Sequence, residues 1–246
     1  MTRLELLPAY VLHVRPYRDT SLLVELFSEP LGRITGVARG ARQRKSRTRS
    51  LLNPFVRLLL SLQGKSDLKL ITHIEADEPG QILVGESLYS GLYLNEILMR
   101  LLPEQDAHPE LFLAYQQSLG YLQKGVPLEP VLRSFELTLL TELGYVPDLS
   151  VTADTGQRVE LEGVYFFEPQ RGLLSVSPRA ALPALSGKAI FHIAERDFST
   201  PETRQVAKYL CRQMLAPLLG SKPLKSRELF LTQSPKLMLS HHPDQK

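Results

Sequence analysis

The sequence predicts an α+β protein in which a five-stranded OB-fold barrel is followed by a mainly α-helical domain. Two observations support this fold class: short β-like segments occupy the first part of the chain, and helical periodicity replaces them after Glu78-Pro79-Gly80. With 246 residues, 43% of them hydrophobic, the chain is long enough for two folded domains. We place the barrel domain at 1–80, the helical domain at 81–233 and a flexible tail at 234–246.

Five segments of the first domain have the length, composition and bounding turns of strands. The last of them alternates, with Leu68, Leu70 and Ile74 among the residues on one face and Ile71 as the exception. One long connection precedes the fourth strand, which is typical of a small Greek-key barrel such as an OB-fold; an SH3-like barrel is the nearest alternative. The five segments span residues 10–18, 21–28, 32–40, 55–62 and 68–76.

The apolar residues of the second domain recur at helical spacing in four segments. Thr200 is suited to cap the start of the last of these helices, and Gly220 to end it. Before that helix, residues 146–178 are rich in turn-forming residues and predict a β-hairpin excursion built around 158–164 and 173–176. The four predicted helices span 87–102, 109–123, 129–143 and 201–219.

Charge is distributed unevenly along the chain, although the net charge is only +3. Residues 1–80 carry 13 lysines and arginines against eight acidic residues, whereas 81–150 carry three against nine. The sharpest feature is the segment 30–66, which has nine basic residues and no acidic one. Such a run repels itself, so it is favourable only when it is solvated or faces a polyanion.

Six of these cations fall within the eleven positions of 39–49, between the third and fourth predicted strands. A solvated basic loop is the simpler interpretation, but this density favours phosphate as the ligand. Tyr17, beside the first turn of the barrel, is a candidate to stack on a base or to pack in the core or at the rim. The predicted DNA contacts are Arg39, Arg42, Arg44, Lys45, Arg47 and Arg49.

A second basic cluster lies near the C-terminus. On the predicted helix 201–219, the side chains of Arg204, Lys208 and Arg212 form one stripe opposite an apolar face. This stripe is either the solvated face of an ordinary amphipathic helix or a second DNA-binding surface. Because the two basic clusters flank the acidic middle of the chain, folding could bring them into one groove. Three further cations follow the stripe, at Lys222, Lys225 and Arg227.

The sequence offers no recognisable set of catalytic or metal-binding residues. Its histidines have no metal-ligand spacing, and no Cys-x2-Cys pair occurs. Cys211 is the only cysteine, and its position among apolar residues of a helix favours a place in the core over a role as nucleophile. We therefore predict that the protein is not an enzyme. A nuclease is disfavoured because no carboxylates cluster at metal-binding spacing.

Several short motifs occur in the order seen in one bacterial family. The most specific is Gly220–Arg227, with the sequence GSKPLKSR, and Leu12–Tyr17 is the second. On these motifs the chain resembles the RecO family of bacterial recombination mediators between residues 8 and 231. The other motifs that carry the resemblance are Ala38–Arg42, Asn53–Phe55, Gly91–Glu96, Arg133–Glu136 and Leu143–Tyr145.

The resemblance implies an N-terminal OB-fold, a central helical domain and a C-terminal zinc-ribbon-like excursion. It also implies binding of single- and double-stranded DNA, annealing of complementary strands, and partnership with RecR, RecA and single-stranded DNA-binding protein (SSB). One departure concerns zinc: some family members carry four cysteines in the excursion, whereas 146–178 contains none. Without thiolates a structural zinc site is not credible, so we expect neither zinc nor another cofactor.

SSB ends in an acidic, apolar tail, and a site for such a tail needs a cation beside an apolar pocket. The candidate is Arg133, one of three basic residues in the acidic middle, which lies between Leu132 and Phe135. The alternative interpretation is a surface ion pair with Glu129 or Glu136 of the same helix.

Two functions stay open. The preferred one is a non-enzymatic DNA-repair mediator that anneals strands, including SSB-coated ones, and with RecR promotes loading of RecA. The alternative is a structural adaptor that docks on SSB and recruits RecR without itself pairing strands. No apolar run reaches the ~18 residues of a membrane span and no secretory leader is apparent, so we expect a cytoplasmic, nucleoid-associated protein.

Overall fold

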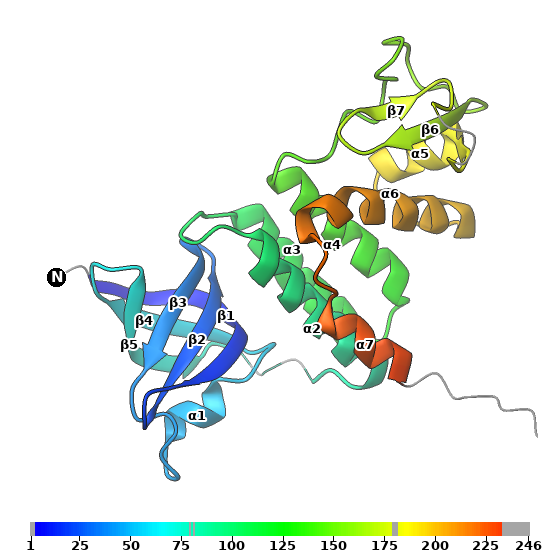
Figure 1. Cartoon of the computed structure of the whole chain (residues 1–246). Coiled ribbons are helices and arrows are strands. Elements are labelled where there is room, and N and C mark those ends of the chain that lie inside the picture. The colour runs from blue at the N-terminus through cyan, green and yellow to red at the C-terminus, as the bar shows by residue number, and fades with distance from the viewer. Residues whose placement is uncertain (1–2, 79, 81, 179–181, 233–246) are drawn as a thin grey trace, which may run out of the picture.

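The structure is a computed structural model that describes residues 3–78, 80, 82–178 and 182–232 (Figure 1). Five strands near the N-terminus close into a barrel in the order β1–β2–β3–β5–β4, in which only β3 and β5 pair in parallel. This closed five-stranded barrel confirms the predicted OB-fold. The strands are β1 (Arg3–Tyr17), β2 (Ser21–Ser28), β3 (Gly32–Ala38), β4 (Arg57–Gln63) and β5 (Leu68–Ala76). The predicted tail, 234–246, lies outside the described residues.

Strand β1 closes the barrel because it pairs with β4 through its first half and with β2 through its second. Register shifts between Leu4 and Leu7, and between Val11 and His13, let this long strand curve around a narrow barrel. The barrel interior is filled by apolar side chains, which include Val24, Leu26, Ile34, Leu58, Leu60 and Ile71.

The predicted faces of β5 are wrong in its first half, whereas Ile74 packs against the barrel core as the predicted face requires. Ile71, the exception in the alternating pattern, is the buried residue, whereas the residues of the predicted face are half-buried or exposed. Leu62 of β4 lies opposite Ile71. Its neighbour Ser61 lies opposite His73, so Thr72 is an extra residue in β5. Such a bulge changes which side chains point inward, and a simple alternation does not hold across it.

The four predicted helices are present, with ends within two residues of the prediction. They are α2 (Gly85–Leu101), α3 (Pro109–Gln123), α4 (Leu128–Glu142) and α6 (Pro201–Leu219). Thr200 caps α6 as predicted, because its hydroxyl accepts a hydrogen bond from the backbone N–H of Thr203 at 3.1 Å. Three shorter helices were not predicted: α1 (Arg47–Leu51), α5 (Gly187–Ala194) and α7 (Lys225–Thr232).

The excursion contributes two strands to a three-stranded sheet in the order β7–β6–β8, and the third strand, β8, follows the excursion along the chain. The predicted hairpin is present, but its first strand begins at Val164 instead of Arg158. Nearby, the carboxylate of Asp154 accepts hydrogen bonds from the backbone N–H and the hydroxyl of Ser175. The strands are β6 (Val164–Glu168), β7 (Gly172–Leu174) and β8 (Leu185–Ser186).

The barrel and the helical domain share one apolar core. Tyr10 and Phe27 of the barrel pack against Phe112 and Tyr115 of α3, with ring centroids 5.1 to 6.1 Å apart. Asn95 of α2 donates to a backbone carbonyl of β1 at 3.1 Å and accepts a hydrogen bond from the Tyr115 hydroxyl at 2.5 Å. These contacts fix the barrel against the helices. None of the described helices is both long and apolar enough to cross a bilayer.

Candidate nucleic-acid interface

The predicted DNA-binding loop leaves the barrel at the end of β3 and returns at the start of β4, with α1 projecting from the barrel (Figure 1). All six predicted cations are exposed. The loop is anchored at Arg42, whose backbone N–H donates to Thr20 and whose guanidinium donates to the carbonyl of Arg18, both at 2.9 Å. Further along, α1 carries Arg47 and Arg49. The cations therefore lie on a segment that is fixed to the barrel at its base.

Within the described chain, none of these six cations forms an ion pair with a carboxylate. Other cations of the same basic segment do: Arg33 lies 3.1 Å from Glu104, and Arg57 lies 3.3 Å from Asp77. The structure thus separates cations that pair with carboxylates from six exposed cations that do not, of which Arg42 also anchors the loop through a backbone carbonyl. Mutual repulsion among the six is relieved when a polyanion binds.

A shallow pocket of about 180 Å³ opens beside the base of this loop. Its lining includes Tyr17, Arg18, Arg39 and Lys69, from the β1–β2 turn and the ends of β3 and β5. The guanidinium of Arg18 lies 5.2 Å from the centre of the half-buried Tyr17 ring. The turn between β1 and β2 is one of the loops that bind oligonucleotides in OB-folds. Stacking of Tyr17 on a base stays a prediction, as does its packing at the rim.

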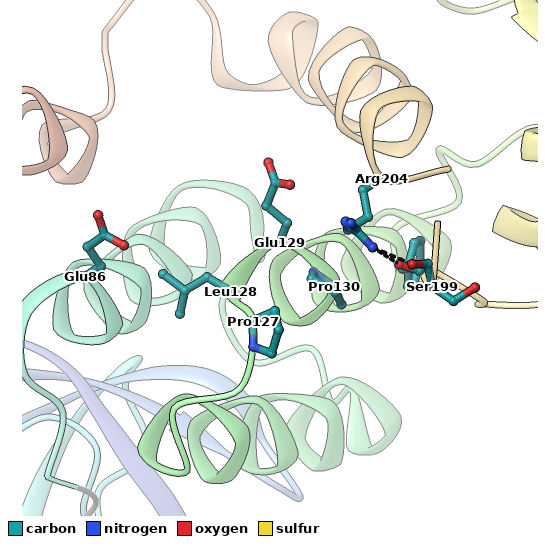
Figure 2. A pocket seen from close by; sticks show the side chains of 8 residues that line it. Glu86, Pro127, Leu128, Glu129, Pro130, Ser199 and Arg204 are labelled. Atoms are coloured by element: carbon teal, nitrogen blue, oxygen red, sulfur yellow. Dashed lines mark hydrogen bonds between the residues drawn. The ribbon is translucent and has the colours of Figure 1, made fainter. Parts of the chain in front are cut away.

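The C-terminal stripe is engaged in contacts within the protein. Arg204 donates to two carbonyls of the segment before α6, one of them Ser199, at 2.7 and 2.9 Å (Figure 2). Lys208 pairs with Glu129 of α4 at 2.8 Å, and this hydrogen bond lowers the pKa of Glu129. Arg212 is exposed one turn further along. DNA binding by the stripe stays a prediction, and two of its three cations have structural partners.

The space below Arg204 is a pocket of about 640 Å³ between the helices. The carboxylates of Glu86 and Glu129 line this pocket together with Arg204, with Glu129 between the other two in the view of Figure 2. Mixed charge of this kind does not favour a phosphate backbone. The fold also separates α6 from α1, which lie on opposite sides of the molecule in Figure 1. The two predicted basic clusters therefore do not form one groove.

Arg133 is buried, with 7% of its surface exposed. Its guanidinium lies 2.6 Å from a carboxylate oxygen of Glu136, and the hydroxyl of Tyr93 donates to the same oxygen at 2.6 Å. Burial raises the pKa of Glu136, and Arg133 opposes that effect. The pair with Glu136 was the alternative interpretation, although it lies inside the protein and not at its surface. A role for Arg133 in binding the SSB tail stays a prediction and requires the pair to open.

A groove that the sequence did not predict lies between α3 and α4 and has a volume of about 390 Å³. Its apolar lining includes Tyr121, Val131 and Phe198, and the exposed Arg196 contributes a cation. The guanidinium of Arg196 donates to the carbonyl of Ser134 at 3.3 Å, which holds it beside the groove. Sequence reasoning missed this site because Arg196 follows α5, a helix of eight residues that was not predicted, and lies far from α3 along the chain.

No group of three or more histidine, cysteine, aspartate and glutamate side chains is placed to hold a metal ion in the described part of the chain. Cys211 is buried, and burial raises the pKa of its thiol well above the usual value. A buried thiol with a raised pKa is a poor nucleophile.

The fold and the site place this protein among OB-fold proteins with a basic surface. Its closed barrel packs on a helical domain and carries an exposed basic loop whose cations pair with no described carboxylate. Residues 1–79 match the family described as "Recombination protein O N terminal", and residues 84–228 match "Recombination protein O C terminal". The chain therefore belongs to the RecO family, whose role is in DNA repair and recombination. This confirms the resemblance seen in the motifs.

Similar proteins align over nearly the full length of the chain. It is 51% identical to the DNA repair protein RecO of Cellvibrio japonicus, over 95% of this chain and 99% of that protein. It is 46% identical to the DNA repair protein RecO of Stutzerimonas stutzeri, over 93% of this chain and 95% of that protein. The corresponding protein of Pseudomonas aeruginosa is 45% identical, over 91% of this chain and 94% of its own length.

Proposed function

We propose that the protein is a non-enzymatic DNA-repair mediator that binds single- and double-stranded DNA through its barrel and anneals complementary strands. The loop 39–49 carries this proposal, because its six cations are exposed and form no ion pair with a described carboxylate. Annealing needs no nucleophile. It needs cations that neutralise two phosphate backbones, so that the strands can approach and search for register.

Binding through phosphate contacts tolerates any sequence and weakens with salt, with a log–log slope of about −0.7 per phosphate on single strands. The test is a salt titration of a labelled single strand with the variant Arg44→Ala/Lys45→Ala/Arg47→Ala. Its slope is expected to be shallower than that of the wild type by about two. The control variant removes the same charge at exposed positions elsewhere, Lys124, Arg158 and Lys188. A salt-independent wild type, or an equal loss in the control, would contradict the proposal.

We further propose that the groove between α3 and α4 receives the acidic, apolar tail of SSB. The groove combines an apolar lining with the exposed cation of Arg196, which are the two features such a tail requires. Arg133 offers the same charge only after its pair with Glu136 opens. With SSB bound there and RecR as partner, the protein would promote loading of RecA on the DNA that it has bound.

The same groove is the observation that favours the adaptor function, in which the protein docks on SSB and recruits RecR without pairing strands. The two functions differ in one measurable property, the annealing of naked complementary oligonucleotides by the protein alone. An adaptor leaves the rate of spontaneous annealing unchanged, whereas a mediator raises it.

A further inference from the structure

The loop that joins α6 to α7 combines a fixed backbone with free cations. The motif Gly220–Arg227, the most specific of the motifs in the sequence, covers this loop and the first turn of α7, so that Lys222 lies in the loop and Lys225 and Arg227 lie on α7. Its buried side chains are Leu224, in the core shared by the barrel and the helices, and Ser226. The cations Lys222, Lys225 and Arg227 are all exposed.

Glu96 of α2 fixes one end of this loop. Its carboxylate accepts hydrogen bonds from the backbone N–H groups of Lys225 and Ser226, at 2.9 and 2.8 Å, and from the Ser226 hydroxyl at 2.7 Å. Burial opposes the charged form of Glu96, but these hydrogen bonds outweigh burial and lower its pKa. The N-terminus of α7 is therefore already occupied by an anion of the protein itself, and an external phosphate has to bind to side chains.

Arg100, one turn further along α2, fixes the other end. Its guanidinium donates to the carbonyl of Leu219, which has no helical partner where α6 ends, and to the carbonyl of Pro223 in the loop. Glu96 and Arg100 lie four residues apart and so share one face of α2. The side chains between these two anchors are presented to solvent on a loop that has little freedom left to lose on binding.

Within the described chain, no carboxylate forms an ion pair with any of the three exposed cations, although Glu228 follows Arg227 in the sequence. The stripe on α6 differs in this respect, because Lys208 is paired with Glu129 and Arg204 with backbone carbonyls. Of the C-terminal cations, those after α6 are thus the better placed to meet a ligand. Three cations on one short, fixed segment match the repeated charges of a phosphate backbone.

We infer that this loop and the first turn of α7 form a second phosphate-binding surface, on which Lys222, Lys225 and Arg227 hold the backbone of a second DNA strand. The inference rests on the proposed annealing function, in which the loop 39–49 holds the first strand. In this account the second DNA-binding surface is Lys222, Lys225 and Arg227, and not the stripe of Arg204, Lys208 and Arg212 on α6.

The two surfaces flank the same helix. After α1, the segment with Phe55 packs against α2 so closely that a Cβ at Gly91 would lie 2.9 Å from the Phe55 ring. On α7, Phe230 packs against Tyr89 of α2 with ring centroids 5.5 Å apart. In Figure 1, α1 and α7 both lie at the lower side of the molecule, whereas α6 lies above. Two strands held at these loops would run on either side of the start of α2.

The test compares wild type with the variant Lys222→Ala/Lys225→Ala/Arg227→Ala in two assays with naked oligonucleotides. The first assay is equilibrium binding of one short single strand, and the second is the rate of annealing of two complementary strands. We expect the variant to keep the affinity for one strand within about twofold and to anneal at least about tenfold more slowly. The control variant with alanine at Lys124, Arg158 and Lys188 loses the same charge and is expected to anneal normally.

A charge-keeping variant, Lys222→Arg/Lys225→Arg/Arg227→Lys, separates charge from packing and is expected to anneal like the wild type. Annealing at the wild-type rate by the alanine variant would overturn the inference while leaving the proposed function intact. A wild type that fails to anneal would overturn both. If the alanine variant loses affinity for an SSB-tail peptide and anneals normally, the loop binds an acidic protein segment and the inference is wrong.

Discussion

Glu96 and Ser226 are joined by two hydrogen bonds, in which the backbone N–H and the hydroxyl of Ser226 donate to one carboxylate oxygen at 2.8 and 2.7 Å. The two residues belong to the motifs Gly91–Glu96 and Gly220–Arg227, which are 124 residues apart at their closest. One motif supplies the carboxylate and the other the N–H groups that need an acceptor at the start of a helix. The contact holds the basic loop in place and ties α7 to α2.

Replacing Glu96 with Gln is expected to destabilise the protein by about 1 kcal/mol at pH 7, because the charged acceptor is lost. The pKa of Glu96 is lowered in the folded protein, so its contribution is present above the unfolded-state pKa of about 4.3 and is lost as pH falls through the folded-state pKa. Urea unfolding of the wild type and of Glu96→Gln at pH 7 and pH 3.5 measures the difference in their stability. A stability gap that stays the same at both pH values would contradict the assignment.

Replacing Arg133 with Met is expected to destabilise the protein by about 3–5 kcal/mol, because Glu136 then stays buried without its cation. Burial already raises the pKa of Glu136, so its neutral form stabilises the fold at low pH and that benefit is lost as pH rises through the folded-state pKa. The loss of stability caused by Arg133→Met should therefore be smaller at acidic pH. The double variant Arg133→Met/Glu136→Leu should recover most of the loss, and failure to recover would argue against an uncompensated charge as the cause.

Replacing Arg196 with Ala is expected to weaken binding of an SSB-tail peptide about tenfold, because charge-assisted hydrogen bonds to the tail carboxylates are lost. Arg196 is the informative position because Arg133→Ala changes stability as well as charge. Isothermal titration with the peptide measures the effect. Lys188→Ala, an exposed cation of α5 that does not line the groove, is the matched control. If Arg196→Ala binds the peptide with unchanged affinity, the tail does not bind in this groove.

Replacing Tyr17 with Leu is expected to weaken binding of a single strand by about fivefold or more if the ring stacks on a base. Tyr17→Phe keeps the ring and should keep the affinity. The measurement is fluorescence anisotropy at fixed salt, with thermal unfolding of both variants as the control for packing at the rim. Equal affinities of the Leu and Phe variants would assign Tyr17 to packing alone.

The elements predicted correctly from the sequence are those with a long hydrophobic period or with clear start and stop residues. The helix 109–123 was predicted with the residues that the structure shows, because Pro109 opens it and its apolar face repeats over four turns. The short helices α1, α5 and α7 were missed because none exceeds eight residues, too few for a period to show. In β5 the bulge at Thr72 shifts which side chains point into the barrel. A bulge is set by pairing with the neighbouring strand, so the sequence of β5 alone does not reveal it.

The candidate site was predictable where the function depends on local charge density, as in the loop 39–49. It was not predictable where a charge finds its partner through tertiary folding. Lys208 pairs with Glu129, 79 residues away, and Arg196 reaches the α3–α4 groove from the end of α5. Burial of Arg133 likewise follows from packing between helices, and the helical period of α4 alone did not distinguish that position from a surface one.

The most direct test of the central claim is annealing of complementary oligonucleotides pre-coated with SSB. Wild type is compared with a folded variant that carries alanine at Arg42, Arg44, Lys45, Arg47 and Arg49. We predict that the wild type anneals the coated strands and that the variant does not, because its barrel no longer holds a phosphate backbone. Equal annealing by both proteins would contradict the claim that this loop pairs strands, and annealing by neither would favour the adaptor.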